Sequence, residues 1–172
     1  NTVYKVQMEG LMRLKAMAKI NLGLDVLGKR EDGYHEVRMI MQTIRMYDIL
    51  DIRKTRRPGI VLTTNLPFIP TDQRNLVYKA AQMLMEEFDV EEGLSIKLRK
   101  FIPVAAGMAG GSSDAAAAFV GVNRMFHLGL TEEQLMERAV KVGADVPYCI
   151  MRGTALAEGI GEKLTRLPEV PK

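Results

Sequence analysis

The chain has 172 residues, of which 24 are basic and 21 acidic, so its formal net charge is +3. Its length and its 47% of hydrophobic residues predict one soluble globular domain with a core that needs no disulfide. The mild positive charge does not indicate nucleic-acid binding, but it suits an anionic small molecule. One cysteine and two histidines argue against a structural zinc site, and a reducing cytoplasm is the simplest compartment. No apolar run approaches the ~18 residues of a membrane span.

The N-terminal half has the pattern of β-strands. Residues 18–26 alternate between an apolar face, which we expect to be buried, and a second face that carries Lys19 and Asn21 side by side. Residues 28–33 form a turn with a glycine at each end. We therefore expect an antiparallel arrangement in this half. The apolar face comprises Ala18, Ile20, Leu22, Leu24 and Val26. Further strands are expected over residues 34–44, 48–53 and 59–64.

The second half changes to a helical period. Residues 75–88 place Val77, Ala80, Ala81, Leu84 and Phe88 on one helical face, and Asn75 or Asp72 can cap the helix. Strands before helices favour an α+β fold over a doubly wound sheet. The remaining expected elements are a strand over 94–100, with Leu94, Ile96 and Leu98 inward, helices over 113–126 and 131–143, and a hairpin over 154–167.

The stretch "IPVAAGMAGGSSDAAAAF", residues 102–119, lies between a predicted strand and a predicted helix. A helix start presents free N–H groups and attracts anions, and glycines let a phosphate approach the backbone closely. Ser112 and Ser113 can cap the helix or donate hydroxyls to phosphate oxygens. The stretch is neither a P-loop nor a dinucleotide fingerprint. Its placement favours a phosphate loop over a purely structural turn. Its glycines are Gly107, Gly110 and Gly111.

Three further sites each have a functional and a structural interpretation. Asp145 in "GADVP" is a general base or, as the local sequence favours, a helix N-cap before a proline. Lys19 is a catalytic cation or an ordinary solvated lysine. Tyr34 and His35 can stack on a base or simply begin a strand. Cys149, in an apolar run, is expected to be a buried thiol.

Three separated motifs resemble one family. "PVAAGMAGGSSDAA" is similar to the glycine-serine phosphate motif of the GHMP small-molecule kinases. "AKINLGLDVLGKREDGYHEV" resembles those members that phosphorylate 4-diphosphocytidyl-2-C-methyl-D-erythritol in the non-mevalonate isoprenoid route, and "GADVP" and "GTALAEGIGEKL" fit the same members. The resemblance implies an α+β GHMP-kinase N-terminal domain like domain 2 of ribosomal protein S5, with a mixed or antiparallel sheet packed on helices.

The resemblance also implies a reaction and its residues. ATP with Mg²⁺ would donate its γ-phosphate to the 2-hydroxyl of the cytidine diphosphate-linked methylerythritol, with Lys19 and Asp145 as the catalytic pair. Asn21, Tyr34 and His35 match positions that hold the cytidine end of the substrate. No nucleic-acid or membrane partner is implied, and the protein would be a monomer or a homodimer. The implied ATP phosphate loop comprises Pro103, Val104, Ala105, Ala106, Gly107, Met108, Ala109, Gly110, Gly111, Ser112 and Ser113.

Two loop residues depart from the common family pattern. Ala109 stands where many members have glycine, and it fits only if its φ is negative. Asp114 stands where many have asparagine, and it would repel a triphosphate unless it caps the helix or meets the metal. The adenine pocket is expected near residues 63–79.

The family pattern also predicts domain boundaries. Residues 1–11 are expected to be an extension, 12–165 the ATP-binding domain, and 166–172 the start of a connection to a C-terminal domain that is apparently absent. We expect the 172 residues alone to bind ATP weakly. Two alternatives remain: another GHMP kinase, against which "DGYHE" argues, and a non-catalytic S5-like RNA-binding module, against which the lack of a basic-aromatic patch argues.

Overall fold

The computed structural model describes residues 10–168. Most of the expected extension over residues 1–11, and the last four residues of the expected connection over 166–172, lie outside this described part. The first strand begins at Leu11, inside the range expected to be an extension. Within the described part, no helix has the length and apolar character needed to span a membrane.

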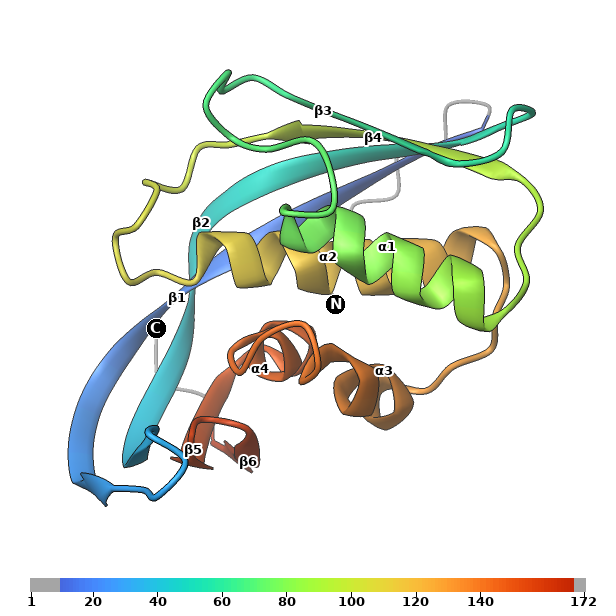
Figure 1. The fold of residues 1–172 in the computed structure, drawn as a ribbon. Helices are drawn as coiled ribbons and strands as arrows, with labels where there is room; N and C mark the ends of the chain where they lie inside the picture. Colours follow the sequence, from blue (N-terminus) through green and yellow to red (C-terminus); the bar gives the residue numbers. More distant parts are fainter. Residues whose placement is uncertain (1–9, 169–172) are drawn as a thin grey trace.

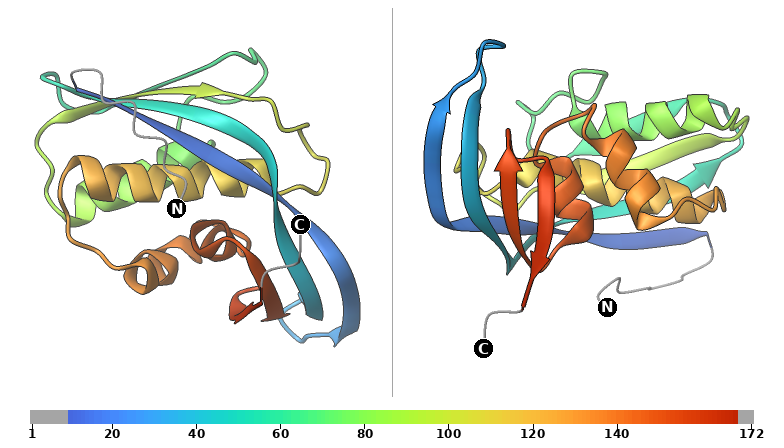
Figure 2. Two further views of the ribbon diagram at one scale, coloured as in Figure 1. Left: turned by 180° about the vertical axis from the view of Figure 1, so that it is seen from behind. Right: turned by 90° about the horizontal axis from the view of Figure 1, so that it is seen from below.

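The described chain folds into a six-stranded sheet with helices on one side (Figure 1). Helices α1 and α2 lie against the concave face of the sheet, and α3 and α4 form a further layer beyond them (Figures 1 and 2). The α+β expectation is therefore confirmed. The elements in chain order are β1 (Leu11–Lys29), β2 (His35–Thr55), β3 (Ile60–Thr64), α1 (Leu76–Glu87), β4 (Gly93–Arg99), α2 (Gly110–Met125), α3 (Glu132–Ala139), α4 (Val146–Met151), β5 (Thr154–Gly159) and β6 (Lys163–Leu167).

Strand β2 organises the sheet because it has three partners. One edge pairs with β1 along almost its whole length. The other edge pairs antiparallel with β4 over residues 49–55 and with β5 over residues 37–42. Between these two stretches the β2 edge has no strand partner among the described residues, and the register of the β1 pairing shifts between Met17 and Lys19. Lys19 and the predicted phosphate loop that it contacts lie at this gap in the sheet.

The core confirms most of the expected helical and strand faces. Val77, Ala80, Ala81 and Leu84 of α1 are fully buried, but Phe88 is the C-cap and is 36% exposed, because Met85 fills that side of the last turn. Asn75 caps α1 by accepting a hydrogen bond from the Val77 N–H. Leu94, Ile96 and Leu98 of β4 are buried. The Thr131–Gln134 capping box at α3 and the β5–β6 hairpin are also present.

Two expectations about the strands were wrong in detail. The segments 34–44 and 48–53 form the single long strand β2. Strand β3 pairs with β4 in parallel, because helix α1 carries the chain between them and such a crossover returns the second strand in the same direction. The sheet is therefore mixed, not antiparallel throughout its N-terminal half.

The expected buried face of β1 is also only half correct. Ala18 is fully buried, but Leu22, Leu24 and Val26 are each more than half exposed. Figure 1 shows why: beyond this point β1 and β2 curve away from α1 and α2 as a hairpin arm, so no helical layer covers those side chains. An alternating pattern identifies a strand, but the covering layer decides whether its apolar face is buried.

Candidate active site

The predicted phosphate loop has the backbone geometry of an anion cradle. Ala105, Gly107 and Ala109 have φ values of +60°, +71° and +54°, whereas Ala106 and Met108 between them have no positive φ. Alternation of right- and left-handed residues turns successive N–H groups toward one point and forms a concave site for anions. The loop therefore provides the shape that a phosphate group requires.

The donors of this cradle are free. Among the described residues, the backbone N–H groups of residues 104–109 donate to no protein acceptor. The loop leads directly into α2, whose first N–H groups and positive dipole end face the same side. Loop residues from Pro103 to Ser112 line a cavity of about 460 Å³, which Asp145 also lines. The other wall includes Ile69, Pro70 and Leu76, within the range expected to hold adenine.

Strand β1 fixes the position of the loop. The Lys19 N–H donates to the Met108 carbonyl (3.1 Å), and the Ser113 hydroxyl donates to the Met17 carbonyl (2.6 Å). Ser113 is buried and makes this tie, so it holds α2 against β1 and is not a free donor to the cavity. Ser112 remains on the cavity wall. Of the two predicted serines, the structure therefore makes only Ser112 available to a ligand.

The structure brings Lys19, Asn21 and Asp145 together. Lys19 is only 4% exposed, so the solvated interpretation of this residue is wrong. Its Nζ donates to Asn21 Oδ1 (2.9 Å) and lies 3.5 Å from Asp145 Oδ2. Because its own N–H binds the loop at Met108, one residue connects the cradle to the carboxylate.

Asp145 occupies a helix start without acting as a side-chain cap. It precedes α4, and Pro147 lies in the first turn as the local sequence predicts. However, the Asp145 carboxylate makes no capping hydrogen bond, and its side chain is 31% exposed toward the cavity. The carboxylate is therefore available to a ligand. The neighbouring Cys149 is a buried thiol, as expected, and burial raises its pKa to about 12.

Tyr34 and His35 lie apart from this group. Both are exposed at the tip of the β1–β2 hairpin, where His35 pairs with Lys29. From Asn21 to Lys29 the strand runs up to roughly 25 Å at the usual rise of ~3.3 Å per residue. The two residues thus occupy the far end of the hairpin arm, and only a long ligand would contact both ends.

Alanine was expected to fit at position 109 only with a negative φ, and the structure does not meet this condition. Its φ and ψ are +54° and +34°, the left-handed region, at the N-cap of α2. The conformation is imposed by the loop alternation and by the tie between Met108 and Lys19. An L-residue there costs roughly 1–2 kcal/mol relative to a right-handed conformation.

Replacing Ala109 with glycine should therefore stabilise the fold. We expect the free energy of unfolding of Ala109→Gly to rise by up to about 1 kcal/mol, because steric relief outweighs the greater entropy of glycine in the unfolded chain. Urea unfolding measures this change. Ala106→Gly is the matched control, since Ala106 has no positive φ, and it should lower stability. Equal loss in both variants would contradict the assigned backbone strain.

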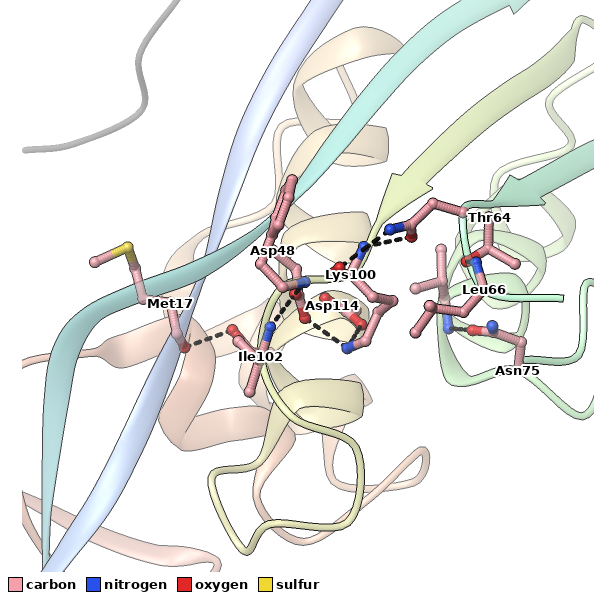
Figure 3. A network of polar contacts seen from close by, with 12 residues as sticks. Met17, Asp48, Thr64, Leu66, Asn75, Lys100, Ile102 and Asp114 are labelled. Atoms are coloured by element: carbon pink, nitrogen blue, oxygen red, sulfur yellow. Dashed lines mark hydrogen bonds and ion pairs between the residues drawn. The ribbon is translucent and has the colours of Figure 1, made fainter. Parts of the chain in front are cut away.

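A buried charge network closes the base of the loop (Figure 3). Lys100 Nζ donates to both Asp48 Oδ2 and Asp114 Oδ2, the latter at 2.6 Å. Asp48 Oδ1 accepts the N–H groups of Phe101 and Ile102, where the chain leaves β4. Asp48 therefore accepts the backbone N–H groups that follow β4, while Lys100 links Asp48 to Asp114 in the first turns of α2.

The sequence analysis did not identify Asp48 or Lys100. Each stands at the end of a predicted strand, and no local pattern distinguishes either from an ordinary surface charge. Their burial, 0% and 8% exposed, arises only when three distant segments meet. Asp114 neither caps the helix nor faces the cradle as a free charge, because Lys100 neutralises it.

Asp114 should give the protein a specific pH dependence. Burial, and the charge of Asp48, raise the pKa of Asp114 well above its usual value despite the opposing effect of Lys100, and its Oδ1 is buried without a partner. The stability that a raised carboxyl pKa provides is complete below the unfolded pKa and is lost as pH rises through the folded pKa. Asp114→Asn removes this loss.

We therefore expect Asp114→Asn to gain stability relative to the unmodified chain as pH rises from 5 to 8. Urea unfolding at several pH values within this range measures the difference. Because both chains share every other titrating group, a pH-independent difference would contradict the raised pKa of Asp114.

Known proteins resemble this chain along most of its length. A family model described as "GHMP kinases N terminal domain" matches residues 75–153. A protein from Lachnospira eligens named 4-diphosphocytidyl-2-C-methyl-D-erythritol kinase is 58% identical over 160 residues, which cover 93% of this chain and 56% of that protein. A protein of the same name from Clostridium botulinum is 55% identical over 156 residues, covering 91% and 55%. The chain thus spans about half the length of the curated relatives it matches.

Solved structures agree with these relatives. A crystal structure of 4-(cytidine 5'-diphospho)-2C-methyl-D-erythritol kinase matches with a TM-score of 0.79 and 35% identity, covering 91% of this chain and 55% of the other. Homoserine kinase from Cytophaga hutchinsonii matches with a TM-score of 0.74 at 19% identity, covering 97% and 55%, and shows the shared fold alone. The chain therefore has the fold of the GHMP-kinase N-terminal domain, and its residues 75–153 match the model of that family.

Proposed function

We propose that the chain forms the ATP-binding and catalytic half of a kinase that phosphorylates the 2-hydroxyl of 4-diphosphocytidyl-2-C-methyl-D-erythritol. The observation that carries the proposal is the approach of Lys19 Nζ to Asp145 Oδ2 (3.5 Å) at the wall of a cavity formed by a free N–H cradle. Relatives at 54–58% identity that bear this name support the choice of substrate over those of other GHMP kinases.

The cradle and the start of α2 would hold the triphosphate of ATP. Phosphoryl transfer leaves the protein little covalent work, so positioning and charge neutralisation account for most of the catalysis. The free N–H groups of the loop point to one site, and they would stabilise the negative charge on the transferred group without reorganising. Ser112, on the same wall, would add a hydroxyl donor.

Asp145 and Lys19 would act on the substrate hydroxyl. Asp145, which no helix N–H occupies, would orient the hydroxyl and accept its proton as the new phosphate ester forms. Lys19 would stabilise the negative charge that develops on the attacking oxygen, and Asn21 holds its ammonium group in place. The cytidine end would extend toward Tyr34 and His35 along the hairpin arm.

Mg²⁺ would accompany ATP in this site. No cluster of three His, Cys, Asp or Glu side chains able to hold a metal occurs among the residues that the structure describes. Mg²⁺ needs no such cluster, because it usually takes one or two protein oxygens together with phosphate oxygens and water. Of the oxygen-bearing side chains on the cavity wall, Asn75 caps α1 and Asp114 pairs with Lys100, so Asp145 and Ser112 are placed to contribute. The ion would neutralise phosphate charge when bound.

A substrate panel tests the proposed function. The full-length protein, with ATP and Mg²⁺, should phosphorylate 4-diphosphocytidyl-2-C-methyl-D-erythritol in preference to homoserine, mevalonate or galactose, as followed by phosphorus NMR of the products. Preference for a substrate without cytidine would transfer the protein to another branch of the family. Absence of any product at high enzyme concentration would contradict the kinase assignment.

A further inference from the structure

A second cavity lies at the opposite end of α2 from the phosphate loop. It has a volume of about 820 Å³ and is bounded by the last turns of α2, the start of α3, the end of α4 and strand β6. Arg124, Arg152 and Arg166 line it. From Ser112 in the first cavity to Arg124, helix α2 rises about 18 Å, so the two cavities are separate.

The charge in this second cavity is not balanced. Arg166 Nη2 pairs with Glu132 Oε1 (3.0 Å). Within residues 10–168, the Arg124 side chain forms no hydrogen bond or ion pair, and the Arg152 side chain bonds only to the backbone carbonyl of Lys15, through its Nη2 (2.8 Å). Burial, opposed by nearby Cys149, lowers the pKa of Arg152, and the positive charge of Arg124 lowers it further. Arg124 and Arg152 therefore line a cavity in which the lining carboxylate, Glu132, is paired with Arg166.

The backbone of Arg152 is strained. Its φ and ψ are +59° and −177°, a conformation that is essentially restricted to glycine. Hydrogen bonds hold it there: the Arg152 N–H donates to the Tyr148 carbonyl, and the following Gly153 N–H donates to Thr43 Oγ1. Glycine would satisfy the fold at position 152 without strain. A cationic side chain kept at a strained position beside a cavity is typical of a ligand-binding residue.

The other residues that line the cavity indicate the chemical class of its ligand. Val120, Leu130 and Leu135 give the cavity an apolar side, and its volume lies within the range of small-molecule pockets. Guanidinium groups bind phosphate through paired, charge-assisted hydrogen bonds, and Arg152 uses one of its five N–H donors on Lys15. Two uncompensated cations match the two charges of a phosphate monoester, whereas a carboxylate supplies one.

We propose that this cavity is a second binding site, distinct from the ATP cradle, for an organic phosphate monoester. Arg124 and Arg152 bind the phosphate group, Arg166 lies at the rim with its partner Glu132, and the apolar wall contacts the organic part of the ligand. The proposal does not depend on the kinase reaction. It rests on the cavity, on the two arginines without a carboxylate partner and on the strained backbone of Arg152.

Calorimetric titration of the full-length protein with phenyl phosphate tests this site, with a non-hydrolysable ATP analogue saturating the phosphate loop. Arg124→Gln and Arg152→Gly should each weaken binding by at least about tenfold, because each removes a charge-assisted contact. Arg152→Gly should not lower the melting temperature, since glycine relieves the backbone strain. Benzoate, which carries one charge, should bind more weakly than phenyl phosphate.

Arg56→Gln is the matched control, because Arg56 is exposed on the β2–β3 loop away from the cavity. It should leave phenyl phosphate binding unchanged. If Arg56→Gln weakens phenyl phosphate binding as much as the cavity variants do, the effect comes from the net charge of the protein and the proposal is overturned. Unchanged binding in both cavity variants would also overturn it, as would no binding of phenyl phosphate to the unmodified protein at millimolar concentration. If the unmodified protein binds no probe and Arg124→Gln is less stable, an acidic side chain of the same protein occupies the cavity and pairs with Arg124.

Discussion

Asp145→Asn in the full-length protein is expected to lower kcat by roughly 10²–10⁴-fold, the usual contribution of a general base. Asparagine preserves the shape of the side chain but accepts no proton at neutral pH. The ATP cradle consists of backbone N–H groups on a separate loop, so the affinity for ATP measured without Mg²⁺ should change little. The combination of a lost kcat with retained nucleotide binding separates a proton-accepting role from a role in holding ATP.

The structure also indicates how Asp145→Asn should affect stability. The Asp145 carboxylate gives α4 no capping hydrogen bond, so its removal costs no helix cap, and the stability change reports the loss of its charge beside the buried Lys19 ammonium. Glu91→Gln, an exposed carboxylate on the α1–β4 loop, is the matched control and should retain full activity. Initial rates, a fluorescent-nucleotide titration and a thermal melt measure the three quantities. Full turnover by Asp145→Asn would show that this carboxylate is not the proton acceptor.

Local sequence patterns predicted the individual helices and strands of this fold better than they predicted which elements pair or pack with one another. Periodicity alone located β4, α1 and α3, because each has an apolar face and a capping or turn signal within its own segment. The parallel pairing of β3 and β4 depends on how the chain crosses between them. The exposure of the β1–β2 hairpin arm depends on where the helical layer ends. Such information resides in contacts between distant segments, which no single window of sequence contains.

The same division applies to the candidate site. The position of the phosphate loop followed from glycines between a strand and a helix, but the left-handed Ala109 contradicted the residue preference. The closeness of Lys19 and Asp145 was expected only from the family resemblance, and the structure brings them within 3.5 Å. Asp48 and Lys100 had no signal, because an isolated charge at the end of a strand is usually solvated.

Lys100→Met is expected to lower the free energy of unfolding by about 3–5 kcal/mol, the usual effect of removing one partner from a buried charge network. Lys100 is almost fully buried between the carboxylates of Asp48 and Asp114. Burial opposes its charge, yet the two carboxylates raise the pKa of Lys100 above its usual value. Its stabilising effect is therefore complete below a pH of about 10.5 and is lost only as pH rises through the raised pKa.

Removing the lysine leaves two carboxylates buried together without a cation. Asp48 still accepts the N–H groups of Phe101 and Ile102, so Asp114 bears most of the loss, since Lys100 is its only partner among the described residues. The double variant Lys100→Met with Asp114→Asn should therefore recover part of the lost stability. Non-additivity of this kind measures the coupling between the two side chains.

Lys97→Met on the same strand is the matched control, because its side chain lies on the exposed face of β4 and it should cost little. Urea unfolding of the unmodified chain, Lys100→Met, Asp114→Asn and the double variant gives the cycle. A loss in Lys100→Met no larger than that in Lys97→Met would show that the charge network does not hold the fold. If the network does hold it, the same variant should also free the start of the phosphate loop, since Lys100 links Asp48 at one end of that loop to Asp114 at the other. Hydrogen exchange of the Phe101, Ile102 and Ser113 amides, which are hydrogen-bonded at the two ends of the loop, should then accelerate in Lys100→Met and not in Lys97→Met, because local opening no longer has to break a buried ion pair.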